Sequence, residues 1–172
     1  IASLATSIPS SDRPPAVAPH ISFARLVAQG DYASAAKAEI LVGFRHWNEA
    51  RTAEAVAAYS RAHELVERAE PSPTVAYVMT RIAINLMLRG RFEETLALCE
   101  RAEAVADRFG LDEIRAHILN TRGVARVNHG DLGGSADLDE SIGLDGPLGK
   151  LAVAPHLTQM AWVFVMNSAT DR

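Results

Sequence analysis

The amino-acid sequence predicts an all-α protein built from tandem antiparallel helical hairpins, and three observations carry this prediction. Nearly half of the 172 residues are apolar but only 6% are aromatic, a balance that suits closely packed helices better than sheets. Proline is absent from two long tracts, residues 20–70 and 74–146, as long helices require. Small residues recur at a constant interval, the one that separates Gly90 from Gly130, and such an interval is typical of tandem repeats.

The N-terminal residues 1–20 differ from the rest of the chain. They hold four of the eight prolines together with several serines and show no apolar periodicity, so we expect an extended or disordered linker. Residues 21–172 are long enough for one helical domain but not comfortably for two. No signal peptide is visible, because the apolar stretch at residues 1–8 is short and has no basic start. The sequence begins without methionine, so we expect a processed chain or a fragment of a longer one.

Gly-led breaks divide residues 21–172 into apolar-periodic segments. Gly30, Gly90 and Gly130 each end one apolar run, and an aromatic residue or Leu follows two positions later. Glycine adopts the left-handed conformation after a helix without steric cost, and the following apolar side chain is expected to pack back on the turn. The predicted helices span residues 21–29, 31–48, 51–69, 74–89, 91–109, 112–129, 132–143 and 151–167.

The constant interval connects equivalent positions of successive hairpins. Gly130 follows Gly90 by one 40-residue step (130 − 90), and the same step backwards from Gly90 reaches Ala50. Other small residues share this step, as they must where two helices cross closely. These series are Gly43, Ala83 and Gly123; Ala55, Thr95 and Ser135; and Ala62 and Ala102. The predicted repeats lie near residues 36–75, 76–115 and 116–151, with a partial unit at 152–172, and the third slips near residues 137–141, as one deleted residue would cause.

The residues at these positions resemble the tetratricopeptide repeat (TPR) family. The second repeat carries the family's pattern of small, turn-forming and apolar residues as Ala83, Gly90, Phe92, Thr95, Cys99 and Ala102. The resemblance covers about residues 22–144 and implies hairpins stacked as a right-handed α-solenoid. The 40-residue units are similar to the TPR-like domains appended to large bacterial LuxR-type or cyclase/ATPase-type regulators. Arg122 occupies a position usually given to Leu, which predicts a polar inclusion or a shifted register in the third hairpin.

The resemblance implies that the first helix of each hairpin lines a concave surface that binds a protein partner. The family's surface positions fall here on Lys37, Ile40, Phe44, Trp47, Tyr77, Thr80, Ile84, Met87, His117, Asn120, Val124 and Val127. A groove with aromatic and Met side chains can receive an amphipathic helix, an extended peptide or a partner domain. Only Lys37 and Asn120 match the basic clamp of chaperone-binding members, so we do not expect a chaperone carboxylate clamp.

Two interpretations of these positions remain open. If the register is shifted by one residue, the larger apolar side chains belong to the core, namely Phe44, Ile84, Val124 and Val127. Side chains with polar atoms are better groove candidates, because a core would have to satisfy those atoms; they are Tyr77, Thr80, His117 and Asn120. The alternative to a protein-interaction or scaffolding module is a small-ligand-sensing repeat domain of a transcriptional or signalling regulator.

The C-terminal segment 151–165 is the most hydrophobic part of the chain. It is interrupted by Pro155, and it falls short of the roughly 20 apolar residues that a membrane span needs, so we expect no membrane insertion. Its apolar side chains come last, with no later helix to cover them. The sequence therefore predicts either a missing next repeat or a homo-oligomer formed through Met160, Trp162 and Phe164.

Charge, cysteine content and missing motifs exclude several other classes of protein. The net charge is −4 and no region is strongly basic, so we expect no nucleic-acid binding by this chain. Cys99 is the single cysteine, which fits a reducing cytoplasm and predicts a small buried hydrophobe. No phosphate loop, nucleophile motif or His-based metal motif occurs, and the acidic residues near His129 are expected to form a charged loop and helix start. We therefore expect a cytoplasmic non-enzyme without cofactor or metal.

Overall fold

The computed structural model describes residues 23–144, and 82% of these residues are helical, with no strand among them. The seven helices are α1 (Phe23–Ala28), α2 (Tyr32–Asn48), α3 (Thr52–Val66), α4 (Pro73–Leu88), α5 (Phe92–Phe109), α6 (Asp112–Asn128) and α7 (Gly134–Leu144). Every boundary lies within three residues of its prediction, and the all-α class is confirmed. The predicted linker 1–20, the predicted helix 151–167 and its contact residues Met160, Trp162 and Phe164 lie outside the described residues.

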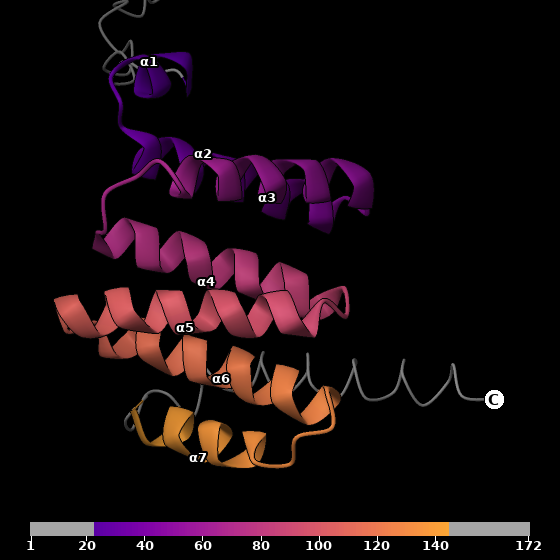
Figure 1. Ribbon diagram of the computed structural model, residues 1–172. Helices are drawn as coiled ribbons and strands as arrows, with labels where there is room; N and C mark the ends of the chain where they lie inside the picture. Colours follow the sequence, from indigo (N-terminus) through magenta and orange to yellow (C-terminus); the bar gives the residue numbers. More distant parts are fainter. Residues whose placement is uncertain (1–22, 145–172) are drawn as a thin grey trace, which may run out of the picture.

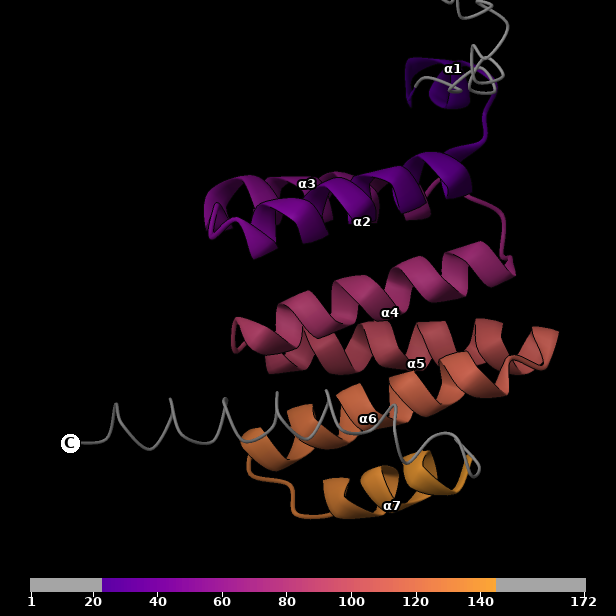
Figure 2. The same ribbon diagram turned by 180° about the vertical axis from the view of Figure 1, so that it is seen from behind.

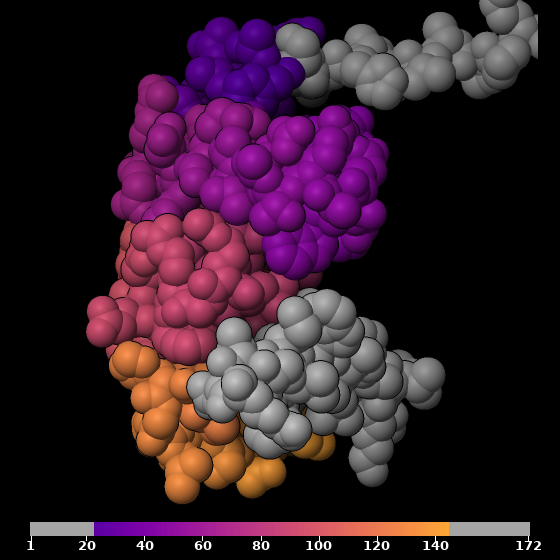
Figure 3. Space-filling model, turned by 90° about the vertical axis from the view of Figure 1, so that its right-hand side faces the viewer, coloured from indigo at the N-terminus to yellow at the C-terminus, as the bar shows by residue number. Residues whose placement is uncertain are grey.

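The helices follow one another along the molecule in chain order, from α1 at one end to α7 at the other (Figures 1 and 2). Three antiparallel pairs, α2–α3, α4–α5 and α6–α7, pack along their lengths, and α5 also packs on α6. In addition, α2 packs on α4 and α4 packs on α6. These three helices therefore form a continuous row, and the space-filling view shows the successive layers in the same order (Figure 3).

Five turns between helices share one backbone geometry. The residues with positive φ are Gly30 (74°), Ala50 (57°), Gly90 (72°), Gly110 (63°) and Gly130 (93°). The amide that follows each of them donates to the carbonyl five residues earlier, as from Arg51 to His46 (2.9 Å) and from Arg91 to Leu86 (3.0 Å). This hydrogen bond is the Schellman closure of a helix end, which normally selects glycine. The 40-residue step that makes Ala50 equivalent to Gly90 and Gly130 therefore connects residues with the same backbone conformation.

The connection between α3 and α4 uses a different signal. Ser72 has extended backbone geometry, its hydroxyl oxygen accepts a hydrogen bond from the amide of Val75 (3.3 Å), and Pro73 is the first helical residue. A serine cap followed by proline defines the start of a helix, because proline lacks an amide that the first turn would leave unpaired. This connection accounts for the proline cluster between the two proline-free tracts.

The core is rich in small side chains that allow close approach of the helices. Ala36, Ala62, Ala83 and Ala102 are fully buried in one cluster that runs from α2 to α6. Cys99 is fully buried in the same cluster, and burial raises the pKa of its thiol to about 12. The cysteine therefore behaves as the small buried hydrophobe that the sequence predicted.

Two glycines mark the closest crossings within the antiparallel pairs. A Cβ atom on Gly43 would lie 3.0 Å from the Tyr59 ring, and one on Gly123 would lie 2.7 Å from the carbonyl oxygen of Gly134. The carbonyl oxygen of Ala55 faces Gly43 as that of Gly134 faces Gly123. The facing residue comes 12 positions after Gly43 (55 − 43) but only 11 positions after Gly123 (134 − 123). The third pair is therefore one residue shorter, and the shortening lies in the turn rather than near residues 137–141.

This shortening corrects two expectations about the last turn. Ser135, which the 40-residue step placed at the helix crossing, is exposed, and Gly134 stands there instead. Leu132, which was expected to pack back on the turn, is 79% exposed. The turn is closed by a polar contact, since the Asp131 carboxylate accepts a hydrogen bond from the amide of Gly133 (2.9 Å).

Candidate partner-binding site

The predicted concave-face residues lie on α2, α4 and α6, the three helices of the continuous row. Their exposure falls into three groups. Lys37, Phe44, Trp47 and Val127 are exposed; Tyr77, His117 and Asn120 are partly buried; Ile40, Thr80, Ile84, Met87 and Val124 are buried. The open surface therefore belongs mostly to α2, whereas α4 contributes largely buried side chains.

Several buried members of the set already have structural roles. Thr80 is 4% exposed, and its hydroxyl donates to the carbonyl oxygen of Ala76 (2.8 Å) within α4. Its polar atom is therefore satisfied inside its own helix. Met87 and Val124 form a small cluster with Ala125 that joins α4 to α6. These residues hold the row together, in line with the interpretation of Val124 as core.

A pocket of about 180 Å³ lies between α2 and α4. It is lined by Phe44, Trp47, Asn48, Tyr59, Arg81, Ile84, Asn85 and Leu88. Three of these, Phe44, Trp47 and Ile84, were predicted as partner-binding residues, so the structure brings them together. Phe44 is 46% exposed and Trp47 is 38% exposed. Large aromatic side chains that border a pocket and remain this exposed are typical anchors for a partner.

Arg81 is the charged residue of this pocket, and the sequence analysis missed it. Its guanidinium carbon lies 5.7 Å from the centre of the Phe44 ring, within the range of a cation–π contact. Its Nε atom is buried and has no hydrogen-bond partner, and no carboxylate of residues 23–144 forms an ion pair with it. The spacing places Arg81 four positions after Tyr77 on the same helix face, but this spacing alone does not reveal the unpaired charge.

Tyr59 shows how this charge acts inside the pocket. Burial raises the pKa of its hydroxyl above the ordinary value, and the positive charge of Arg81 and a hydrogen bond from it act in the opposite direction. Arg81 is therefore close enough to interact with a neutral hydroxyl, but that hydroxyl cannot neutralise it. The pocket keeps its positive charge.

A second cation–aromatic contact joins the same two helices. The ammonium group of Lys37 on α2 lies 5.6 Å from the centre of the Tyr77 ring on α4. The cation stands on α2 in this contact and on α4 in the contact between Arg81 and Phe44. Both contacts fix a positive group over an aromatic face along the α2–α4 line.

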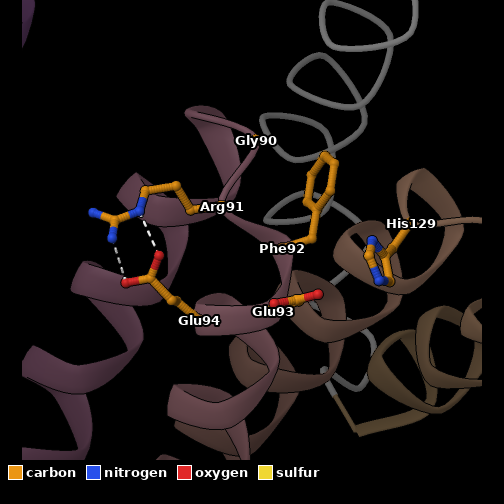
Figure 4. Close-up of a pocket in the computed structure, with 6 residues that line it drawn as sticks. All are labelled: Gly90, Arg91, Phe92, Glu93, Glu94 and His129. Atoms are coloured by element: carbon orange, nitrogen blue, oxygen red, sulfur yellow. Dashed lines mark hydrogen bonds and ion pairs between the residues drawn. The ribbon is translucent and has the colours of Figure 1, made fainter.

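Two further pockets differ in that their arginines are paired with carboxylates. One, of about 240 Å³, lies at the turn between α4 and α5 and is lined by Gly90, Arg91, Phe92, Glu93, Glu94 and His129. In it Arg91 donates to both oxygens of Glu94 (2.5 and 2.6 Å), and the centres of the Phe92 and His129 rings, which are tilted relative to each other, lie 6.2 Å apart (Figure 4). The other, of about 310 Å³, contains Arg122, Arg126 and Asp131.

The arginines of the largest of these pockets belong to a network that fixes α7. Arg122 donates to both oxygens of Asp137 (2.9 and 3.1 Å), and Arg126 bonds to Asp137 (2.9 Å) and Asp131 (2.8 Å). Burial raises the pKa of Asp137, but the hydrogen bonds from both arginines outweigh it and hold that pKa below the ordinary value. This is the polar inclusion that the position of Arg122 predicted, and its charges are committed to the fold.

The acidic residues of the charged loop at the start of α7 are paired with arginines. Asp131 and Asp137 accept hydrogen bonds from arginines. Within residues 23–144 no three His, Cys, Asp or Glu side chains are grouped so that they could hold a metal ion. The same part of the chain contains no helix that is both long and apolar enough to cross a bilayer.

The chain was also compared with known proteins. Neither protein-family models, nor curated protein sequences, nor solved structures give a match.

Proposed function

We propose that the chain is a TPR-like helical repeat module, a right-handed α-solenoid of about 40-residue units, that binds a protein partner on the row formed by α2, α4 and α6. The shared turn geometry at Ala50, Gly90 and Gly130 supports the repeat. The observation that carries the binding role is the pocket in which exposed Phe44 and Trp47 stand beside an unneutralised Arg81. Such a module fits a scaffold within a larger cytoplasmic regulatory protein.

The size of the pocket favours a peptide or helix over a free metabolite. Pockets for drug-sized molecules usually have about 300–1,000 Å³, whereas this one has about 180 Å³. That volume suits one inserted side chain of a larger partner. The remainder of the partner would then lie along the row, as in the binding of a helix or extended peptide by a groove.

A peptide selection tests this proposal directly. The full chain is used to select from a phage library of random peptides of roughly 16 residues, long enough for about four turns of helix. Selected peptides are then titrated calorimetrically against the wild type and against Phe44→Ala. Loss of the aromatic anchor should weaken binding about tenfold or more, as expected for a residue at the centre of an interface.

Phe109→Ala is the matched control. Phe109 on α5 is 39% exposed and has Arg108 at 5.5 Å from its ring centre, so it reproduces the exposure and cation–π contact of Phe44 away from the pocket. Binding should be unchanged in this variant. Failure to enrich any peptide, or equal losses in both variants, would contradict the proposed site.

A further inference from the structure

We infer that the partner segment is acidic, and that it places Asp or Glu side-chain carboxylates on Arg81 and Lys37 while an apolar side chain enters the pocket beside Phe44 and Trp47. This inference rests on the proposed function of the same site and adds the chemistry of the partner. Four features of the α2–α4 line lead to it: its unpaired charges, the spacing of these charges, the way they are held, and the neutral groups around them.

The first feature is the unpaired charge of Arg81 and Lys37. Several other arginines have a carboxylate partner, as in Arg61 with Glu39 (2.8 Å), Arg101 with Glu67 (2.8 Å) and Arg115 with Glu140 (2.9 Å), although Arg45, Arg68, Arg89 and Arg108 form no ion pair within residues 23–144 either. Within residues 23–144 neither Arg81 nor Lys37 has such a partner. The shielded Nε of Arg81 lacks any acceptor, and a buried donor without an acceptor is unfavourable. A carboxylate from outside would supply the counter-charge that the described residues do not give this guanidinium group.

The second feature is the spacing of the two positive groups. Lys37 lies over Tyr77, and Arg81 follows Tyr77 by one helical turn. One turn advances the helix by about 5.4 Å, so the two contacts lie about one turn apart along α4 and, from Lys37 to Phe44, about two turns apart along α2. Two acidic residues one or two turns apart on a helix, or two to three positions apart in an extended strand, fit between these limits.

The third feature is that aromatic rings hold both cations before any partner arrives. Arg81 lies over Phe44 and Lys37 lies over Tyr77. A cation restrained in this way loses less side-chain freedom on binding. The planar guanidinium group can still meet a carboxylate through two parallel hydrogen bonds, the arrangement for which arginine is best suited.

The fourth feature is the chemistry of the remaining lining. Asn48 and Asn85 add amide groups that can bond to a peptide main chain, while Ile84 and Leu88 are apolar. A polyanion such as nucleic acid needs many phosphate contacts, and the chain has a net charge of −4. A short segment with two or three carboxylates and an apolar anchor fits this lining better.

Paired peptides provide the test. Each peptide obtained from the selection is synthesised with its Glu and Asp residues intact and with Gln and Asn in their place, both with amidated C-termini. Binding of the acidic form to the wild type should be roughly tenfold tighter or more, the effect of a charge-assisted hydrogen bond. With Arg81→Gln the two forms should differ by much less, and Arg81→Lys should restore part of the difference.

Arg89→Gln serves as the matched control, because Arg89 is exposed at the end of the same helix and does not line the pocket. It should preserve the preference for the acidic form. Thermal unfolding of each variant verifies that it is folded, and a single-stranded oligonucleotide is titrated in parallel. The inference alone is overturned if peptides bind in a Phe44-dependent manner but without preference for the acidic form, or if Arg81-dependent binding is found for the oligonucleotide. The proposed function fails instead if no Phe44-dependent peptide exists.

Discussion

At the scale of single residues, the crossing of α6 and α7 depends on the absence of a methyl group. A Cβ atom on Gly123 would come within 2.7 Å of a backbone oxygen and 2.8 Å of the Leu138 side chain. At Gly43 the nearest atom would be a ring carbon of Tyr59 at 3.0 Å, and the nearest backbone atom, the carbonyl oxygen of Ala55, would be farther away at 3.4 Å. Overpacking of a crossing is costly mainly when the opposing atom belongs to the backbone.

We therefore predict that Gly123→Ala lowers the free energy of unfolding by about 1–3 kcal/mol, because the α6–α7 crossing must widen. Gly143→Ala is the control, since a Cβ at that helical position meets nothing within 4 Å; it should be neutral or stabilise the protein by up to about 1 kcal/mol. Urea unfolding followed by circular dichroism measures both. A Gly123→Ala protein as stable as the control would disprove the close crossing.

The residues of the candidate site also show which of its features could be predicted from the sequence. Phe44 and Trp47 were predicted because large aromatic side chains stood at the positions that face a partner in the TPR family. Arg81 was missed because its importance depends on the missing carboxylate and on a ring supplied by α2. The missing carboxylate and the aromatic ring depend on how two neighbouring helices pack, so the spacing of residues within α4 could not predict them.

At the scale of the helices, the α6–α7 pair has an ion pair at the position where the α4–α5 pair has apolar side chains. By the 40-residue step Arg122 corresponds to Ile82 on α4, and with the one-residue deletion Asp137 corresponds to Leu98 on α5. Ile82 and Leu98 are both buried in the core. The two exchanges occur together, so the Arg122–Asp137 pair fills the space of an apolar pair and leaves neither charge alone.

This correspondence predicts the stability of two variants. Asp137→Asn should lower the free energy of unfolding at neutral pH by roughly 2–4 kcal/mol, because two partly buried guanidinium groups lose their common partner. The double variant Arg122→Ile with Asp137→Leu copies the second pair and should lose much less, since Arg126 keeps Asp131 (2.8 Å) and Glu103, which also pairs with Arg122, keeps Arg115 (4.0 Å). A double variant less stable than Asp137→Asn would show that the pairs are not equivalent.

The pH dependence of the free energy of unfolding of Asp137→Asn tests the same ion pair in a second way. The folded pKa of Asp137 lies below its ordinary value of 3.8, so the carboxylate contributes its full stabilisation above that value. The contribution is lost as the pH falls through the lower, folded pKa. The difference between the wild type and Asp137→Asn should accordingly be constant near neutral pH and shrink in acid.

The helices themselves were the most predictable feature, because glycine, proline and capping residues mark their ends in the sequence. The sequence indicated that one residue is missing from the third pair, but it did not indicate where in the pair the deletion lies. A deletion in the turn and a deletion inside α7 leave similar residue patterns, and only the contact between Gly123 and Gly134 distinguishes them.

At the scale of the whole molecule, packing is local along the chain. α4 contacts α2, α3, α5 and α6, whereas α1 packs on α2 and α7 packs on α6 in the described part. α1 has no buried residue, while most of α4 is buried. Where helices pack mainly on their neighbours along the chain, stability is expected to be close to a sum of units and of the interfaces between neighbours. The ends should therefore open without the centre.

Hydrogen exchange measured by mass spectrometry on the full chain should reveal this gradient. We expect the amides of α4 to exchange most slowly and those of α1 to have little protection, because local opening follows the amount of buried contact. Met87→Ala makes the prediction specific, since Met87 packs with Val124 between α4 and α6 and its truncation should cost about 2–4 kcal/mol. Exchange should accelerate in α6 and α7 and stay almost unchanged in α2 and α3, on the far side of α4. Uniform acceleration of all helices would show a single cooperative unit, and the additive description of the array would then be wrong.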